Sequence, residues 1–356
     1  MKRRWKVAIG VGGLLAATIL LPMAYIEIGC QSPIAGFNPA APYKPILQPA
    51  ERRPEARTFL TYPEWHIVYS AESYGRHLTA AQRPSGYAFG GDIGGFWSSY
   101  CALNRATVGG DAGDAKMMIY TIGISYTVEM AVKAAYERLI GRFFEWTGGW
   151  HSADDHYAAN VQRAYGQFMH ETPWYMFPFG KVLRGEWRTA DSENRLRHAE
   201  RRFALSAEYG VKAGYAKLIG SAAGATMEPA APKLWFVAKG PSGAIQAIDP
   251  RLKPIRTAGG LTVVEAPRYA QFTDLLGKLA ASPIEVIEIS GNDDILVTLL
   301  ATAPPEPADG TVLISQALAD RPGWQRYGVS TKVPKLLALL RTVKARGGTV
   351  EHVYDY

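Results

Sequence analysis

An apolar run from Val7 to Ile28 constrains this chain most, because it fixes which side of a membrane the rest can occupy. It reads VAIGVGGLLAATILLPMAYIEI, about 20 residues before Glu27, and a helix of that length spans the roughly 30 Å hydrocarbon core of a bilayer. Lysines and arginines precede it, at positions 2, 3, 4 and 6. The positive-inside rule then keeps the amino terminus in the cytoplasm. Residues 1–30 are therefore predicted to be a transmembrane signal-anchor.

This anchor predicts a bacterial-type, single-pass protein of the inner (cytoplasmic) membrane, with the bulk of the chain periplasmic. A cleaved signal peptide is the alternative, because a charged start, an apolar segment and small residues near Gly29 fit that pattern too. We favour the anchor because the run exceeds the usual signal core of about 7–15 residues and no A-x-A site closely follows it. Glu27 argues against lipid attachment at Cys30, since an aliphatic residue is expected three positions before a lipidated cysteine.

Composition places the remainder among globular proteins. The chain has 356 residues, 47% hydrophobic and 20% charged, which is enough for two ordinary domains after the anchor. Its net charge of +7 is dispersed, so we expect attraction to anionic lipid headgroups or a solubilising surface, and no nucleic-acid partner. Two cysteines, Cys30 and Cys101, exclude a disulfide scaffold. Because Cys30 sits at the membrane edge, we expect no bridge between them.

The pattern of residues predicts an α+β fold in three parts after the anchor. Residues 31–57 contain six prolines and predict a semi-rigid stalk. A capping box from Thr61 to Glu64 then opens a mostly α-helical domain over residues 58–222, with four or five helices. Residues 232–356 alternate in hydrophobicity and are predicted to form a ferredoxin-like α+β domain with an insertion before its second helix.

Two local expectations within that last domain concern strands. Residues 244–248 are predicted to be extended, and residues 284–289 and 295–301 are predicted to pair as a hairpin around Gly291-Asn292. The ferredoxin-like pattern hosts many unrelated functions, so it indicates no particular chemistry.

One candidate site is a catalytic pocket of histidine and glutamate. Glu64, His66 and His77 lie on the first predicted helix, and Glu129 lies inside an apolar helix, where a raised pKa would suit proton transfer. Glu208 is a further member from the last helix of the domain. The competing interpretation makes both histidines boundary residues and pairs Glu129 with Lys133 along its own helix.

A second candidate site would bind a metal. The segment His151-Ser-Ala-Asp-Asp-His156 packs four possible ligands into six residues, and His151, Asp155 and His156 are the proposed donors. The competing interpretation is an ordinary helix start, where Ser and Asp act as caps. The sequence lacks a di-iron E-x-x-H pair and a zincin motif, and no cofactor can be named from it.

The third candidate is a surface for lipid. Aromatic residues crowd one stretch of the helical domain, and such rings occur both in cores and at membrane interfaces. They are Phe143, Phe144, Trp146, Trp150, Trp174, Tyr175, Phe177 and Phe179. We therefore expect an anchored protein acting in binding or assembly at the membrane, with membrane lipid as the first partner and a hydrophobic small molecule or a membrane protein complex as others. The alternative is a membrane-associated enzyme that acts on a lipid-like substrate.

Overall fold

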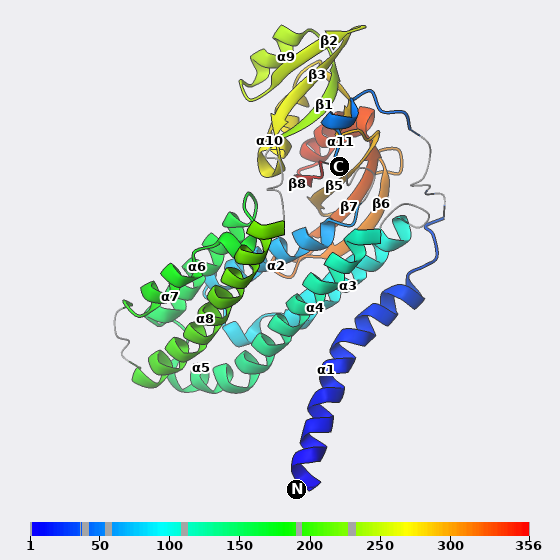
Figure 1. Cartoon of the computed structure of the whole chain (residues 1–356). Helices are drawn as coiled ribbons and strands as arrows, with labels where there is room; N and C mark the ends of the chain where they lie inside the picture. The colour runs from blue at the N-terminus through cyan, green and yellow to red at the C-terminus, as the bar shows by residue number, and fades with distance from the viewer. Residues whose placement is uncertain are drawn as a thin grey trace. The chain divides into compact units, whose positions relative to one another are not determined.

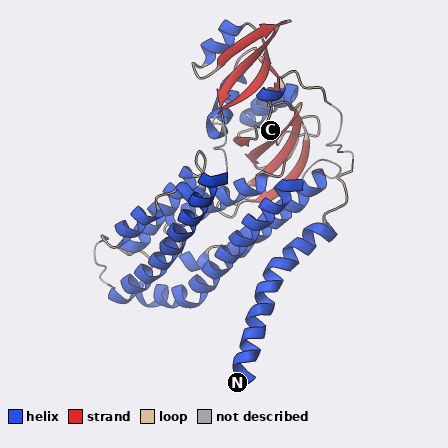
Figure 2. Ribbon diagram, viewed as in Figure 1, coloured by secondary structure: helices blue, strands red, loops and turns tan. Residues whose placement is uncertain are grey.

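The computed structural model describes residues 2–35, 37, 43–53, 59–107, 113–189, 194–226 and 233–355, and it shows an α+β protein (Figures 1 and 2). Its backbone contacts divide into two compact units. The helical unit comprises Met1–Pro22, Pro63–Trp97 and Ile119–Pro229. The sheet unit comprises Met23–Tyr62, Ser98–Met118 and Ala230–Tyr356.

The amino-terminal run lies within helix α1, Lys2–Gly29, which contains Pro22. Several of its large apolar side chains are exposed, among them Leu20, Leu21 and Ile28. Among the described residues, no helix has the length and apolarity needed to cross a membrane. The transmembrane anchor therefore stays a prediction.

The chain between α1 and the sheets is built of helices, as its periodicity predicts, but the described residues form seven α-helices where four or five were expected. These are α2 (Tyr62–Thr79), α3 (Phe89–Ala106), α4 (Gly113–Tyr136), α5 (Arg142–Gly148), α6 (Ala153–Phe168), α7 (Phe179–Glu186) and α8 (Arg195–Thr226). A π-helical turn, η3 (Glu137–Gly141), joins α4 to α5, and short 3₁₀ turns occur at Pro84–Gly86 and Trp174–Met176.

Two glycines let α2 and α6 approach closely. A Cβ atom added at Gly75 would lie 3.2 Å from the backbone N and Cα of Arg163. One added at Gly166 would lie 2.8 Å from Cγ of Glu72. A larger side chain at either position would push the two helices apart, so these glycines set how closely α6 packs on α2.

The sheet unit contains two four-stranded antiparallel sheets. The first has the order β2-β3-β1-β4, from β1 (Lys233–Lys239), β2 (Lys253–Ala258), β3 (Leu261–Pro267) and β4 (Glu285–Ile289). The second has the order β6-β7-β5-β8, from β5 (Asp294–Ala301), β6 (Thr311–Ala317), β7 (Gln325–Lys332) and β8 (Thr349–Val353). Three helices accompany them, α9 (Ser242–Ile248), α10 (Tyr269–Leu279) and α11 (Val333–Ala345).

The two sheets repeat one arrangement. In each, the first strand in the sequence lies between the third and the fourth, and a helix connects those last two strands. The halves differ in the link from first to second strand, which contains α9 in one half and no helix in the other. The expectation of a single sheet domain with an insertion is therefore wrong.

The predicted hairpin around Gly291 is wrong for the same reason. Strand β4 pairs with β1, with Phe236 opposite Ile289, whereas β5 pairs with β7, with Val297 opposite Val329. The turn signal is real, since Ser290 and Gly291 both have positive φ, but it carries the chain from one sheet to the next. Residues 244–248 also differ from prediction, because Ile245 and Ile248 lie three apart on one side of α9.

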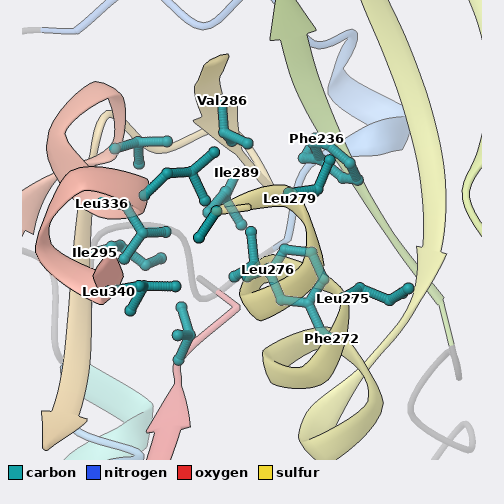
Figure 3. Close-up of a cluster of buried hydrophobic side chains, with 14 of the residues drawn as sticks. Phe236, Phe272, Leu275, Leu276, Leu279, Val286, Ile289, Ile295, Leu336 and Leu340 are labelled. Atoms are coloured by element: carbon teal, nitrogen blue, oxygen red, sulfur yellow. The ribbon is translucent and has the colours of Figure 1, made fainter. Parts of the chain in front are cut away.

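The core of the sheet unit joins both halves (Figure 3). Phe236 of β1, Leu276 of α10 and Ile289 of β4 share one buried cluster with Ile295 of β5 and Leu336 of α11. Burying each such side chain stabilises the fold by roughly 1.5–3 kcal/mol. The two sheets are therefore expected to unfold together.

The described part of the predicted stalk is bound to the first sheet. Glu288 of β4 accepts hydrogen bonds from the Tyr43 hydroxyl at 2.7 Å and from the backbone amides of Ile46 and Leu47 at 2.6 and 3.0 Å. Glu51 forms an ion pair with Arg256 of β2. Residues 43–53 thus do not stand free, and Pro49–Glu51 even forms a 3₁₀ turn, η1.

A disulfide joins Cys30 to Cys101, with a Cα–Cα distance of 5.2 Å, so the expectation of no bridge is wrong. The end of α3 lies beside the end of α1, where Asn104 donates to the Cys30 carbonyl at 2.8 Å and Arg105 donates to the Ser32 carbonyl at 2.9 Å. That contact spans 71 residues of sequence, and the local surroundings of Cys30 do not predict it.

Removing this bridge with the pair Cys30→Ser and Cys101→Ser should destabilise the sheet unit. Closing a loop of 71 residues restricts the unfolded chain by about 4 kcal/mol in the chain-entropy estimate. Thermal unfolding of the purified full chain checks this. The double variant and the reduced wild type should unfold at the same temperature, below the oxidised wild type. Equal midpoints for all three samples would show that the cysteines are not joined.

Candidate functional site

Three of the predicted catalytic residues, His66, His77 and Glu129, each contact a different group. His66 is buried on α2, and its Nε2 donates to the Asp92 carbonyl at 2.9 Å. His77, at the end of α2, donates from Nε2 to the Arg83 carbonyl at 2.8 Å. Glu129 of α4 pairs with Lys212 at 2.8 Å. Glu64 lies in the first turn of α2, more than three turns before His77.

A buried polar cluster that the sequence did not reveal lies close to His66. The Asp92 carboxylate accepts hydrogen bonds from the Ser70 hydroxyl at 2.5 Å and the Tyr87 hydroxyl at 2.6 Å. Tyr126 donates in turn to the Ser70 hydroxyl at 2.6 Å. Burial, and then the charge of Asp92, raise the pKa of both tyrosines well above its ordinary value. This closed network ties α2, α3 and α4 together and is best explained as structural.

Ion pairs link α4 to α8. Lys133 contacts Glu208 at 2.9 Å, and Lys212 bridges Glu208 at 3.2 Å and Glu129 at 2.8 Å. Burial would raise the pKa of Glu208, but Lys133 and Lys212 outweigh it and hold that pKa at about 2. The pairing of Glu129 with Lys133 along one helix, expected from their spacing, is replaced by pairing between helices.

A second layer of the same contact is centred on two arginines of α8. Arg201 donates to both carboxylate oxygens of Glu137, at 3.0 and 3.2 Å, and to Glu200 at 2.8 Å. Arg197 donates to Asp155 at 2.6 Å and to Glu200 at 2.9 Å. All five side chains are buried. Because each charge has a partner, the layer is tolerated inside the unit, and removing one member would leave others uncompensated.

Arg201→Met should therefore destabilise the helical unit by about 3–5 kcal/mol, because Glu137 would remain buried without its cation and Glu200 would keep only Arg197 as a cation. Chemical denaturation followed by circular dichroism checks this. Arg76→Met makes the same change at an exposed pair with Glu72 and should cost less than about 1 kcal/mol. Equal losses for the two variants would contradict the assignment.

Glu186, at the end of α7, has no hydrogen-bond partner for either carboxylate oxygen among the described residues, although it is fully buried. Burial, and then the neighbouring charge of Asp154, raise its pKa from 4.5 to about 8. Asp154 itself is held by His198 at 2.5 Å and by the Thr189 hydroxyl at 2.7 Å. Glu186 is therefore mostly protonated in neutral solution.

This raised pKa makes stability depend on pH with a definite sign. The folded state holds the Glu186 proton more tightly than the unfolded state, so its contribution to stability falls as the pH rises from 4.5 to about 8. Near pH 4.5, Glu186→Gln should have the same melting temperature as the wild type. Near pH 8, its melting temperature should be higher than that of the wild type. Glu208→Gln is the control. It should lower the melting temperature at both pH values, since Glu208 is ionised at each of them. Parallel melting curves for wild type and Glu186→Gln would contradict the protonated state.

The predicted metal residues line a cavity of about 250 Å³ at the start of α6. His151 and His156 are exposed at its edge, but Asp155 lies at its base with its oxygens already used. They accept hydrogen bonds from the Ser152 hydroxyl at 2.7 Å and from Arg197 at 2.6 Å. Over the part of the chain that the structure describes, no three His, Cys, Asp or Glu side chains are grouped to hold a metal ion. The metal site at His151, Asp155 and His156 stays a prediction.

The helical unit also exposes a row of large apolar side chains on each of two helical segments. We use the name apolar outer face for these two rows, whose ten residues are each exposed. Along α4, η3 and α5 they are Val128, Val132, Leu139, Ile140, Phe143 and Trp146, and along α8 they are Leu196, Phe203, Val211 and Leu218. Trp146 is 80% exposed and Val211 is 72% exposed. Apart from the adjacent pair Leu139 and Ile140 in the π-helical turn, successive members of each row are three, four, seven or eight residues apart, the spacing of one side of a helix.

Charge is distributed asymmetrically around the apolar outer face. Exposed basic residues adjoin it at Arg138, Arg142, Arg195 and Lys217. On the described parts of α4, α5 and α8, Glu129 is the exposed acidic residue, and it is paired with Lys212. The border of the face is therefore cationic.

The aromatic group predicted from sequence divides between two roles. Phe143 and Trp146 belong to the apolar outer face, and Phe144 is half-buried beside Phe143. Phe177 and Phe179 are buried in a core cluster, with Trp174 and Tyr175 packed against it. Trp150 is half-buried and stacks with His151.

Comparisons with family models, with curated proteins and with solved structures found no match to this chain. Its function is therefore argued from its own residues.

Proposed function

We propose that this chain is a single-span, membrane-anchored extracytoplasmic protein that acts in binding or assembly at the membrane. We further propose that its helical unit contacts lipid through the apolar outer face. The exposure of that face is the observation that carries the proposal. Soluble monomers rarely expose apolar patches beyond a few hundred Å², and larger ones mark interaction sites.

The composition of the apolar outer face suits a bilayer surface. Helices that lie in the membrane interface place Trp, Phe and Leu toward the acyl chains and Lys or Arg beside the headgroups. Trp146, Phe143 and Phe203 are the residues that would face the acyl chains. Arg138 and Arg142 are among the basic residues that would lie beside the headgroups, where anionic lipid would attract them. Charge complementarity therefore favours lipid as the occupant.

Two further observations support the proposed location. The apolar run of residues 7–28 with its basic flank would hold the chain at the inner membrane. The Cys30–Cys101 disulfide follows directly after that run, and disulfides persist in oxidising compartments such as the periplasm. Both agree with a chain that is periplasmic from Cys30 onward.

We also propose that each half of the sheet unit is ferredoxin-like. The strand order 2-3-1-4, with a helix between the third and fourth strands, supports this for both halves. This arrangement carries no chemistry of its own, so it fits a binding or assembly role.

The enzyme alternative has less support. Of the four residues that it would use, Glu64, His66, His77 and Glu129, the last three each contact a different group. Nothing in the described part of the chain favours catalysis on a lipid-like substrate over binding.

Fluorophore labelling of the full chain in anionic nanodiscs tests the proposal. Both native cysteines are in the disulfide, so Val211→Cys and Val132→Cys each give one labelling site. A nitroxide on the lipid acyl chain should quench these labels at least about threefold more than a label at Ala164→Cys, an exposed position on α6.

Equal quenching of the labels at positions 132, 164 and 211 would contradict lipid contact. Labels on the apolar outer face that are shielded from both the lipid quencher and aqueous iodide would instead show that a protein, including a second copy of the chain, covers it.

A further inference from the structure

The cavity at the start of α6 has no role in the proposed membrane contact. It lies between the end of α2, the turn that follows α2, and the amino-terminal half of α6. Its lining residues are Leu78, Thr79, Ala81, Gln82, Pro84, Trp150, His151, Asp155, His156, Ala159, Asn160 and Arg163. None of them belongs to the apolar outer face.

We propose that this cavity binds a small organic anion, with an apolar or aromatic body and a carboxylate or phosphate head. About 250 Å³ is enough for one ring and one charged group, since a cavity of about 150 Å³ accommodates benzene. The proposal does not rest on membrane contact.

One wall of the cavity is apolar and held in place. The indole Nε1 of Trp150 donates to the Ala81 carbonyl at 2.9 Å. The Arg83 guanidinium carbon lies 4.2 Å from the centre of the Trp150 ring, and the His151 ring lies 4.9 Å from it. A fixed indole beside Pro84 offers a flat surface on which an aromatic or aliphatic body can pack.

The polar wall of the cavity favours negative charge. His151, His156 and Arg163 supply N–H donors, and neither imidazole makes a hydrogen bond to another described residue. Among the described residues, the Arg163 guanidinium makes one long hydrogen bond, at 3.4 Å to the side-chain amide oxygen of Asn160, so its other donors are available. Guanidinium groups bind carboxylate and phosphate through paired hydrogen bonds.

The acidic group in the lining, Asp155, is held by Arg197, which donates to both of its oxygens at 2.6 and 3.3 Å and also to Glu200. The same hydrogen bonds remove Asp155 as a metal ligand. The amino-terminal end of α6, a helix of 16 residues, adds a partial positive charge on the same side. Arg163 is therefore the cation of the lining that is left to meet an anion.

Binding to the purified full chain can be measured by calorimetry with three probes that share a ring. Phenyl phosphate and benzoate should bind, whereas benzylammonium should not. Arg163→Met should weaken phenyl phosphate binding at least about tenfold, because a charge-assisted contact is lost. Arg188→Met is the matched control, since Arg188 is exposed near the end of α7 outside the cavity, and it should leave affinity unchanged.

A second variant tests the proposal even if Arg163→Met does not fold. The pair His151→Asn and His156→Asn changes two exposed side chains and should also weaken phenyl phosphate, with an unchanged circular dichroism spectrum. Phenyl phosphate that binds without benzoate would indicate phosphate as the head group, including that of a lipid. Absence of binding by either anion, equal affinity in Arg163→Met, or tight Zn²⁺ binding in place of anion binding would each overturn the proposal.

Discussion

The helical unit depends on the pairing of charges buried between its helices. Arg201 meets Glu137 and Glu200, and Lys212 meets Glu129 and Glu208. Desolvating such groups costs several kcal/mol per ion, so the unit is stable only if every charge keeps its partner. The contact between α4 and α8 therefore contains buried charged pairs, although α8 also packs Leu205 and Tyr209 into an apolar core cluster. In addition to that core, α5 and α8 expose Trp146, Phe203 and Val211, and this exposure leads to the proposal that these helices meet an apolar environment.

Local patterns in the sequence predicted the helices well because helical periodicity is a short-range property. The capping box of Ser152 and Asp155 starts α6 at the position where the His-Ser-Ala-Asp-Asp-His segment allowed a helix start. The predictions that were wrong concern residues whose partners lie far away along the chain. Cys30 finds Cys101 across 71 residues, and Lys133 prefers Glu208 of another helix to Glu129 of its own. No local pattern specifies such partners, because tertiary packing chooses them.

The strands show the same limit. Turn residues at Ser290 and Gly291 were detected, but a turn signal does not say whether the flanking strands pair with each other. Here β4 and β5 each pair with strands of their own sheets.

The candidate sites also depend on partners that lie far away along the chain. The sequence predicted a metal site at His151, Asp155 and His156, but Arg197, which binds Asp155, lies 42 residues further on and could not be foreseen as its partner.

We expect the apolar outer face to lie against lipid. Photo-crosslinking of the full chain in nanodiscs whose lipids carry a diazirine on the acyl chain, with adducts mapped by mass spectrometry, measures this contact. Lipid contact predicts adducts on residues 128–146 and 196–218, at exposed positions such as Trp146 and Phe203, and none on α6. Adducts confined to α1 would contradict it, because the anchor alone would then meet the bilayer.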